Sequence, residues 1–306
     1  MAISTPADAW PSLALDDWKD TYATLHRWTQ VVGKIRLRQT PWINHSWHVA
    51  LYVTARGLTT SLMAHGTRSF QIDFDFVDHR LVIATGEGAL RTIELRPMSV
   101  AEFHQQVFAT LRDLELPVKI NPIPNELADA TPLDTDREHA SYDPEYASRF
   151  WRVLVQSERI LKAFRAGFIG KCSPVHFFWG SCDMAVTRFS GRPAPQHPGG
   201  VPHLPDDVAR EAYSHEVSSA GFWPGSGPVA FPAYYSYAYP TPAGFAEASV
   251  RPSSAFFSRD LGEFVLPYDD VRTAADPDAV LLAFLQDTYA AAADRAGWDR
   301  AALERS

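Results

Sequence analysis

The chain has 306 residues, of which 46% are hydrophobic and 12% aromatic, so it can bury a substantial core and is not a disordered protein. Its formal charge of -8 argues against a nucleic-acid or anionic-membrane partner, which needs a basic face on the protein. No uncharged apolar run reaches the roughly 18 residues of a membrane-spanning helix.

The cysteine content and the N-terminus bear on the cellular compartment. Cys172 and Cys182 have no zinc-ligand spacing, and two cysteines are too few for a disulfide framework. The first residues lack the basic and apolar regions of a secretory signal. We therefore expect a cytoplasmic protein. Arginine exceeds lysine and Ala and Pro are frequent, which is typical of a GC-rich bacterial genome.

The first predicted elements are a helix and a group of strands. Apolar side chains recur at steps of three and four over residues 16–38 and predict a helix, which Pro41 ends. Four strands should follow, over residues 47–55, 70–76, 81–85 and 89–95. A turn at Gly86–Gly88 joins the last two as a hairpin. Ser99 and Glu102 match a capping box and predict a second helix.

The second half of the chain repeats this kind of order. Residues 116–144 are rich in Pro, Asp and Asn and predict a crossing segment. A long helix should carry the apolar residues from Tyr146 to Phe168 on one face. Asp276 and Pro277 mark the start of the last helix. Between the two helices we expect strand-like residues 173–191, a proline-rich loop at 192–205, a short helix near 206–213, and strands at 233–239, 255–258 and 263–267.

These elements predict an α+β fold in which antiparallel sheets are flanked by helices. The order has two interpretations. It reflects either two pseudo-duplicated helix–meander–helix halves or an accidental likeness, since no residue-level repeat survives. We place the N-terminal half at residues 1–115, the crossing segment at 116–144 and the C-terminal half at 145–306, and we expect one compact unit.

Residues 173–191, SPVHFFWGSCDMAVTRFSG, hold ionisable side chains inside an otherwise apolar and aromatic run. These side chains are His176, Asp183 and Arg188. Burying such groups costs several kcal/mol each unless they are paired. The run therefore indicates the neighbourhood of a functional site.

The geometry of Gly180 and Ser181 decides whether His176 and Asp183 can cooperate. If they form a type II′ hairpin turn, Phe178 faces Asp183, and His176 becomes the diagonal neighbour of Asp183. The carboxylate could then hold the imidazole in one tautomer and raise its basicity. If the run is one strand with a bulge, the two side chains point to opposite faces. A core histidine bonded to a backbone carbonyl is the plainer interpretation of His176.

Other ionisable residues have two interpretations each. Arg188 is either an ion-pair partner at the sheet rim or a fixed cation for a substrate carboxylate or phosphate. Glu216 follows His215, but Ser219 stands where an HExxH zinc motif has its second histidine. One of the two could still join His176 in a site of two histidines and a carboxylate. His176, His215 and Glu216 are thus the metal candidates, and otherwise Glu216 is a surface residue.

Residues 222–242 are dense in aromatic residues, glycine and proline. This composition suits either a rigid wall over a ligand or a loop pinned against the sheet by its aromatic rings. The candidate ligand-contacting rings are Trp179, Trp223, Tyr235 and Tyr239. We expect no nucleotide cofactor, because the chain has neither a P-loop nor a GxGxxG motif after a strand.

Three strings are especially distinctive: NHSWHVALYVTARGLTT, SPVHFFWGSCDMAVTRFSGRP and AYSHEVSSAGFWPG. They resemble segments of an uncharacterised bacterial family, domain-of-unknown-function family 5996. The resemblance extends from about Trp10 to Trp298. It implies a single full-length bacterial module and supplies no activity, cofactor or catalytic residue.

The residues together suggest an enzyme that acts on a small anionic molecule, by acid/base or metal-assisted chemistry, in a pocket between the halves. His176 is the expected acid/base group, Asp183 its orienter and Arg188 the anion holder. His215 and Glu216 would supply a second acid/base or metal-binding group. The alternative is a non-catalytic small-molecule-binding or accessory protein whose buried polar residues are structural. We expect no nucleic-acid or membrane partner in either case.

Overall fold

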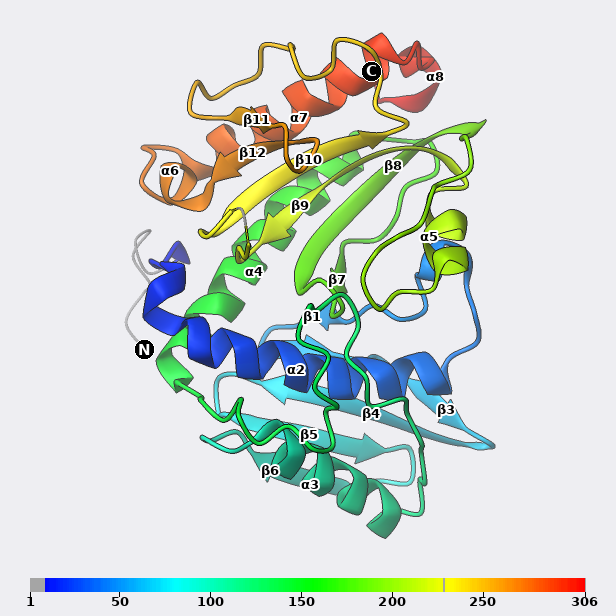
Figure 1. Ribbon diagram of the computed structural model, residues 1–306, viewed down its shortest axis with the longest axis vertical. Coiled ribbons are helices and arrows are strands. Elements are labelled where there is room, and N and C mark those ends of the chain that lie inside the picture. Colours follow the sequence, from blue (N-terminus) through cyan, green and yellow to red (C-terminus); the bar gives the residue numbers. More distant parts are fainter. Residues whose placement is uncertain (1–8, 228, 306) are drawn as a thin grey trace.

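The computed structural model describes residues 9–227 and 229–305. It has two antiparallel sheets with helices between and around them, so the predicted α+β class is confirmed (Figure 1). Residues 1–8, where a signal sequence would begin, and Pro228 of the aromatic run lie outside the described residues. Within the described ranges, no helix has the length and hydrophobicity needed to cross a membrane.

The first sheet has the order β1-β2-β4-β5-β6, and β3 pairs with β4 beside this path. Its strands are β1 (Tyr52–Val53), β2 (Gly57–Thr59), β3 (Met63–His65), β4 (Arg68–Asp75), β5 (Arg80–Thr85) and β6 (Leu90–Glu94). Alternate β4 residues are buried, as predicted. The capping box is also confirmed, because the Ser99 side chain accepts a hydrogen bond from the Glu102 N–H at the start of α3 (Val100–Asp113).

The strand predicted over residues 47–55 is wrong. The chain forms a short 3₁₀ helix, η1 (Asn44–Ser46), then turns and is extended as a strand only in β1. His45 and Ser46 have φ values of 61° and 57°, left-handed conformations that a β-strand cannot contain. The strands β2 and β3, which periodicity did not predict, pair with β4 instead.

The second sheet has the order β11-β12-β10-β9-β8-β7. Its strands are β7 (His176–Phe178), β8 (Asp183–Pro193), β9 (His215–Trp223), β10 (Ala233–Tyr239), β11 (Phe256–Ser258) and β12 (Glu263–Pro267). This order differs from that of the first sheet, so a duplication of the two halves is not confirmed. Shorter helices complete this part of the chain: α5 (Asp206–Ala212), α6 (Tyr268–Arg272) and α8 (Arg300–Leu303).

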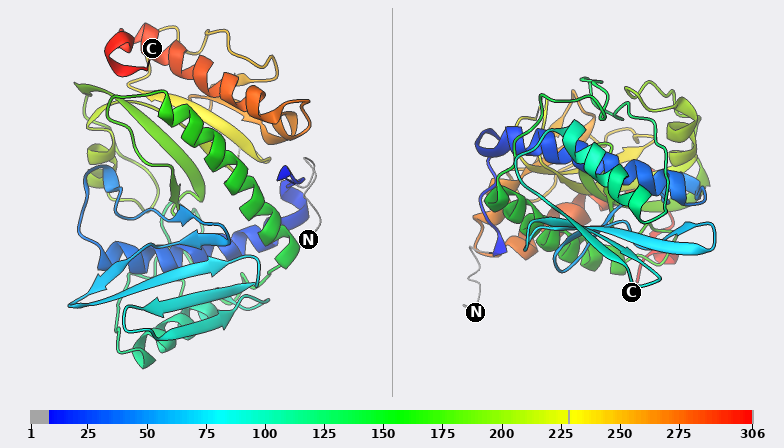
Figure 2. Two further views of the ribbon diagram at one scale, coloured as in Figure 1. Left: turned by 180° about the vertical axis from the view of Figure 1, so that it is seen from behind. Right: turned by 90° about the horizontal axis from the view of Figure 1, so that it is seen from below.

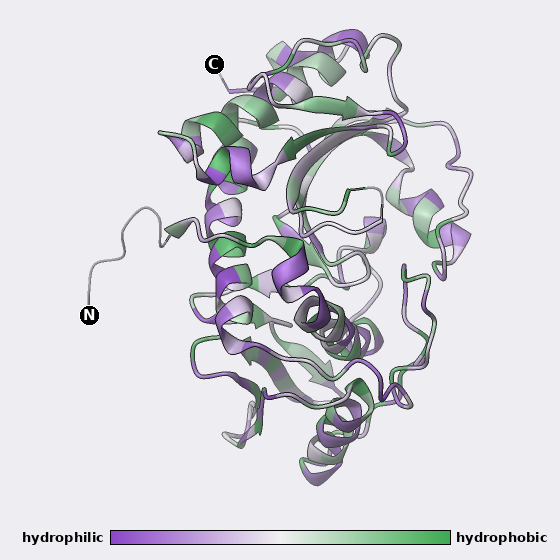
Figure 3. Ribbon diagram, turned by 60° about the vertical axis from the view of Figure 1, so that its left-hand side comes forward, coloured by the Kyte–Doolittle hydropathy of each residue, from purple (hydrophilic) through white to green (hydrophobic). Residues whose placement is uncertain are grey.

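Two long helices cover one face of the second sheet, as Figure 2 shows from behind. These are α4 (Pro144–Ala166) and α7 (Pro277–Arg295). From this face Tyr234 bonds Ser157 of α4, with 2.9 Å between the hydroxyl oxygens. The opposite face, which we call the inner face, carries Asp183, Tyr235 and their cross-strand neighbours. The long strands curve, as Figure 3 shows, and loops pack over the inner face: the Tyr239 hydroxyl donates to the carbonyl oxygen of Pro195 at 3.0 Å.

Helix α2 (Leu15–Gln39) lies between the two sheets (Figure 1). Its His26 Nε2 is 3.1 Å from the carbonyl oxygen of Trp179 and 2.9 Å from that of Gly180, which ties the helix to the β7–β8 turn. At Gly33 the helix meets the Trp179 ring so closely that an added Cβ would overlap it. The packing of α2 therefore fixes the position of the turn.

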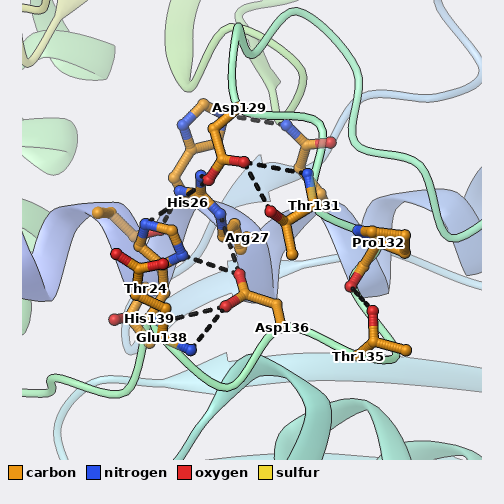
Figure 4. Close-up of polar contacts among 12 residues, drawn as sticks. Thr24, His26, Arg27, Asp129, Thr131, Pro132, Thr135, Asp136, Glu138 and His139 are labelled. Atoms are coloured by element: carbon orange, nitrogen blue, oxygen red, sulfur yellow. Dashed lines mark hydrogen bonds and ion pairs between the residues drawn. The ribbon is translucent and has the colours of Figure 1, made fainter.

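The crossing segment is anchored on α2 by a polar network (Figure 4). Arg27 lies 2.7 Å from a carboxylate oxygen of Asp129 and 3.2 Å from one of Asp136. His139 Nδ1 is 2.8 Å from the second of these carboxylates. Arg27 and Asp136 are buried, so the ion pair holds an irregular segment against the helix without regular secondary structure.

Candidate functional site

The chain forms a hairpin at Gly180–Ser181, which confirms the first of the two geometries that the sequence allowed. Phe178 pairs with Asp183, and His176 pairs with Ala185. The predicted type II′ turn is wrong, because that turn needs a positive φ at Gly180, and the left-handed residue is instead Cys182, with φ 57°. His176 and Asp183 consequently share the inner face as diagonal neighbours.

The expected contact between His176 and Asp183 does not form, which corrects the role of Asp183 as orienter of the imidazole. The Asp183 carboxylate accepts hydrogen bonds from the hydroxyls of Ser181 and Tyr235. Both ring nitrogens of His176 lack a hydrogen-bond partner among the described residues. His176 and Asp183 lie on the same face, but the Asp183 side chain contacts Tyr235 and the His176 ring packs against other aromatic rings.

Asp183 and Tyr235 form the centre of a polar group on the inner face. Tyr235 pairs with Gly221 on β9, and its hydroxyl lies over that glycine, close to where a Cβ would project. The absence of a side chain at Gly221 therefore lets Tyr235 reach Asp183 on β8. Burial raises the pKa of Asp183, and the hydrogen bonds from Ser181 and Tyr235 partly oppose that rise.

Two further carboxyl groups lie close to Asp183. Glu126 comes from the crossing segment and covers Gly180, and Glu263 begins β12. Burial, assisted by the negative charge of Asp183, raises the pKa of Glu126 to about 7 and that of Glu263 to about 7. Among the described residues, neither glutamate nor Asp183 takes part in an ion pair. We call Glu126, Asp183 and Glu263, with Tyr235, the acid cluster.

Three further tyrosines lie near enough to the acid cluster to feel the charge of its carboxylates. Tyr213 and Tyr237 bond each other, with 2.8 Å between their hydroxyl oxygens. Burial raises the pKa of Tyr213 to about 12, and it raises the pKa values of Tyr22 and Tyr237 well above the ordinary value. These hydroxyls consequently keep their protons at neutral pH and remain hydrogen-bond donors. Trp223 lies beside Tyr22 at the same place.

His176 lies elsewhere on the inner face, in an aromatic cage. Its ring centroid is 5.8 Å from that of Trp47, 5.6 Å from that of Tyr52 and 5.3 Å from that of Phe178. Burial, followed by the positive charges of Arg36 and Arg165, lowers the pKa of His176 to about 4. The imidazole is therefore neutral at physiological pH.

Arg188 and Trp179 occupy structural positions. Arg188 points toward the helix-covered face, where its guanidinium donates to the carbonyl oxygen of Phe164 and lies 3.5 Å from the centroid of the Phe164 ring and 4.2 Å from that of Tyr289. Trp179 donates from Nε1 to the carbonyl oxygen of Val49 at 2.8 Å. The structure does not bring either side chain to the acid cluster.

The remaining predicted residues lie near the start of β9 and the end of β10. His215 has its ring centroid 6.1 Å from that of His45, and Glu216 forms an ion pair with Arg192 at 2.7 Å. Glu216 and Tyr239 help to line a pocket of about 260 Å³ beside the end of α7. In the described ranges no three His, Cys, Asp or Glu side chains are arranged to hold a metal, so His176, His215 and Glu216 do not form one ligand set.

Sequence reasoning thus found Asp183, Tyr235 and Trp223 but missed the two glutamates. Glu126 lies in a segment without periodicity, and Glu263 begins a short strand far along the chain. Their proximity to Asp183 depends on long-range packing, and no local pattern carries that information. The only signal available was the density of tyrosines on β10, which the aromatic run already indicated.

Comparison with known proteins identifies a family and no individual relative. The model of the family of unknown function (DUF5996) matches residues 10–305. No curated protein and no solved structure matches the chain.

Proposed function

We propose, for a chain that belongs to the family of unknown function DUF5996, an enzyme that acts on a small anionic molecule by acid/base chemistry. The acid cluster, between the crossing segment and the second sheet, is the proposed reaction centre. One observation carries the proposal: the buried Asp183 carboxylate accepts a hydrogen bond from the Tyr235 hydroxyl, and its negative charge acts on two further carboxyl groups that, like it, have no cationic partner among the described residues. Perturbed groups of this kind concentrate at functional sites.

The glutamates suit proton transfer at neutral pH. A carboxyl group whose pKa is about 7 is present in both protonation states there, so it can accept a proton in one step and return it in another. We assign this exchange to Glu126 and Glu263. Asp183 and the Tyr235 hydroxyl already share a hydrogen bond, and we assign them to orienting a polar group of the substrate.

Several observations support the cellular and chemical setting of the proposal. Cys172 and Cys182 are free thiols, as expected of a cytoplasmic protein in a bacterial cell. Acid/base chemistry is favoured over the metal-assisted version because the described residues offer no grouped metal ligands. A small molecule is the proposed partner, and the acidic net charge argues against nucleic acid and anionic membranes.

The second candidate function is a non-catalytic small-molecule-binding protein. The hydrogen bonds within the acid cluster favour it, since Ser181 and Tyr235 already satisfy Asp183 without a ligand. The two candidates differ in one respect. An enzyme must change its ligand, and a binding protein returns it unchanged.

A panel incubation in D₂O separates the candidates. Purified protein is incubated with mixtures of small carboxylates and phosphate monoesters, and proton NMR follows exchange of C–H hydrogens and the appearance of products. We expect turnover of at least one compound, and we expect Glu126→Gln and Glu263→Gln each to reduce its rate by about 100-fold. Glu247→Gln is the control, because Glu247 is exposed.

Each result of the panel decides between the candidates. Turnover that survives in both glutamine variants would remove the acid cluster from the reaction. Saturable binding without exchange or product for any compound would overturn the enzyme and support the binding protein.

A further inference from the structure

Two neighbouring buried side chains each have two nitrogen atoms without a hydrogen-bond partner among the described residues. The imidazole of His176 has no hydrogen bond at Nδ1 or Nε2 among the described residues. The guanidinium of Arg36 has none at Nε or Nη1, and all four nitrogens are covered. His176 is 1% exposed and Arg36 is 7% exposed. An unsatisfied buried donor costs about 1–3 kcal/mol, and more for a charged group. Orphaned donors of this kind commonly mark an ion or water position.

The surroundings of these atoms are cationic. Arg36 and Arg165 both act on His176 as positive charges, and no carboxylate contributes at this position. The Arg36 guanidinium lies 5.5 Å from the centroid of Tyr52 and also hydrogen-bonds the Tyr52 hydroxyl. Arg165 donates from Nε to the carbonyl oxygen of Ser173 at 2.6 Å and forms no ion pair among the described side chains. The place consequently has hydrogen-bond donors and positive charge, and it lacks an anion.

We propose that Arg36 and His176 form a binding site for an oxyanion, the carboxylate or phosphate group of the substrate. Arg36 donates a charge-assisted hydrogen bond to either group from one of its unpartnered nitrogens, and the imidazole donates a second from whichever nitrogen carries its proton. The site gives the anion-holding role to Arg36 in place of Arg188, which lies on the other face of the sheet.

The position of the site on the sheet relates it to the acid cluster. His176 is paired with Ala185, Ala185 with Gly221, and Gly221 with Tyr235. Cross-strand partners share a face, so these residues form one row across the inner face. The two middle members are small. A substrate could therefore place its anionic group at His176 and its reacting group toward Tyr235.

Entry to the site requires an aromatic ring to move. The four nitrogens are covered, and the rings of Trp47 and Tyr52 lie against His176. Trp47 directly follows the two left-handed residues His45 and Ser46. Left-handed non-glycine residues are held by their surroundings at some energetic cost, so this segment is the one we expect to shift.

Anion titration tests the site separately from catalysis. Inorganic phosphate and acetate are added in turn to the full-length protein at constant ionic strength, and the ¹⁵N signals of the His176 ring and the Tm are recorded. We expect a saturable change of the His176 signals and a Tm increase of about 2 °C or more with at least one anion. Phosphate and acetate distinguish a phosphate group from a carboxylate as the natural occupant.

Variants identify the residues responsible. Arg36→Met and His176→Phe should abolish the Tm increase while remaining folded, because each replaces an unsatisfied polar group with an apolar one of similar size. Arg38→Met, an exposed cation two residues along α2, should retain the response. No saturable response to either anion, or an undiminished response in Arg36→Met, would overturn the site. The oxyanion site rests on the proposed function only where the anion is taken to be part of a substrate. Anion titration measures binding and not turnover, so the results of the Glu126→Gln and Glu263→Gln variants do not affect it.

Discussion

The ion pair of Arg27 with Asp136 is the most deeply buried charge contact between α2 and the crossing segment. Asp136 is 1% exposed, and it accepts hydrogen bonds from the backbone N–H groups of Glu138 and His139. Arg27 keeps a second partner in Asp129, whose side chain is 47% exposed. Asp136 is thus the buried one of the two carboxylates that compensate the charge of the Arg27 guanidinium.

Asp136→Ala should lower the free energy of unfolding by about 3 kcal/mol, because it removes the buried carboxylate beside Arg27 and leaves two backbone N–H donors without their acceptor. Urea unfolding followed by tryptophan fluorescence measures this change. Asp16→Ala is the control, since the Asp16 side chain is 96% exposed, and it should change stability by less than about 0.5 kcal/mol. Equal stability of the two variants would contradict the structural role of the network.

Glu126 and Glu263 should make stability depend on pH. Their folded pKa values are raised to about 7, so their contribution to stability is fully present below the unfolded value of 4.5 and is lost as pH rises through 7. The double variant Glu126→Gln/Glu263→Gln should match the wild type near pH 4.5. At pH 8 it should be more stable by more than about 1 kcal/mol for each carboxyl.

Thermal and urea unfolding at both pH values measure this difference. Glu247→Gln serves as the control and should follow the wild type throughout. A double variant that is less stable than the wild type at pH 8 would mean that the carboxylates are well paired in the folded protein, against the arrangement described for the acid cluster.

Single residues of the site were only partly predictable. Asp183 and Tyr235 stood out because ionisable and aromatic residues alternate with apolar ones in strand-like runs. Glu126 and Arg36 did not, because one lies in an aperiodic segment and the other completes an amphipathic helix. Their proposed roles depend on residues distant in sequence, Asp183 for Glu126 and His176 for Arg36. No local sequence pattern shows that these pairs are close in the fold.

Among the elements, α2 depends on one close contact. Gly33 faces the ring of Trp179, and an added Cβ would overlap three ring atoms. Trp179 is also held by its hydrogen bond to Val49, so it has little freedom to withdraw. The contact therefore fixes the distance between the helix and the β7–β8 turn.

Gly33→Ala should lower the free energy of unfolding by about 1–3 kcal/mol through overpacking, although alanine favours a helix by about 1 kcal/mol. Gly167→Ala is the matched control. Gly167 ends α4 with right-handed φ and ψ, and a Cβ there would meet only ordinary contacts, so stability should be kept or slightly increased. A stabilising effect of Gly33→Ala would refute the close packing of α2 on Trp179.

Periodicity predicted most helices and strands because long amphipathic segments carry a strong pattern. It failed over most of residues 47–55, where aromatic and β-branched residues suggested a strand. Two left-handed residues directly before this segment turn the chain, and only β1 is extended as a strand. The β7–β8 hairpin shows a similar division. The Gly180–Ser181 dipeptide predicted a hairpin with the observed register, whereas the predicted type II′ turn was wrong because Cys182 is the left-handed residue.

At the scale of the whole molecule, one hydrophobic core includes residues of both halves, from Trp10 to Trp298. Helix α2 contributes to it between the sheets, and Leu51 bridges to Phe177 of the second sheet. Neither half can be separated without exposing this core. The domain boundaries expected from the sequence remain predictions about chain segments.

The chain should consequently unfold in a single cooperative transition. Tryptophan fluorescence and far-ultraviolet circular dichroism should give coincident urea curves, with midpoints equal within error. Two resolved transitions, or a stable fragment after cleavage within residues 116–144, would indicate that the halves fold independently.

The proposed reaction centre requires Glu126 and Glu263 to exchange protons near neutral pH. Their carboxyl ¹³C chemical shifts, followed by NMR from pH 4 to pH 9 in protein labelled at glutamate, test this claim directly. We predict two glutamate signals with pKa values of about 7, one lost in Glu126→Gln and the other in Glu263→Gln. Titration of every glutamate near the ordinary value of 4.5 would contradict the proposed reaction centre.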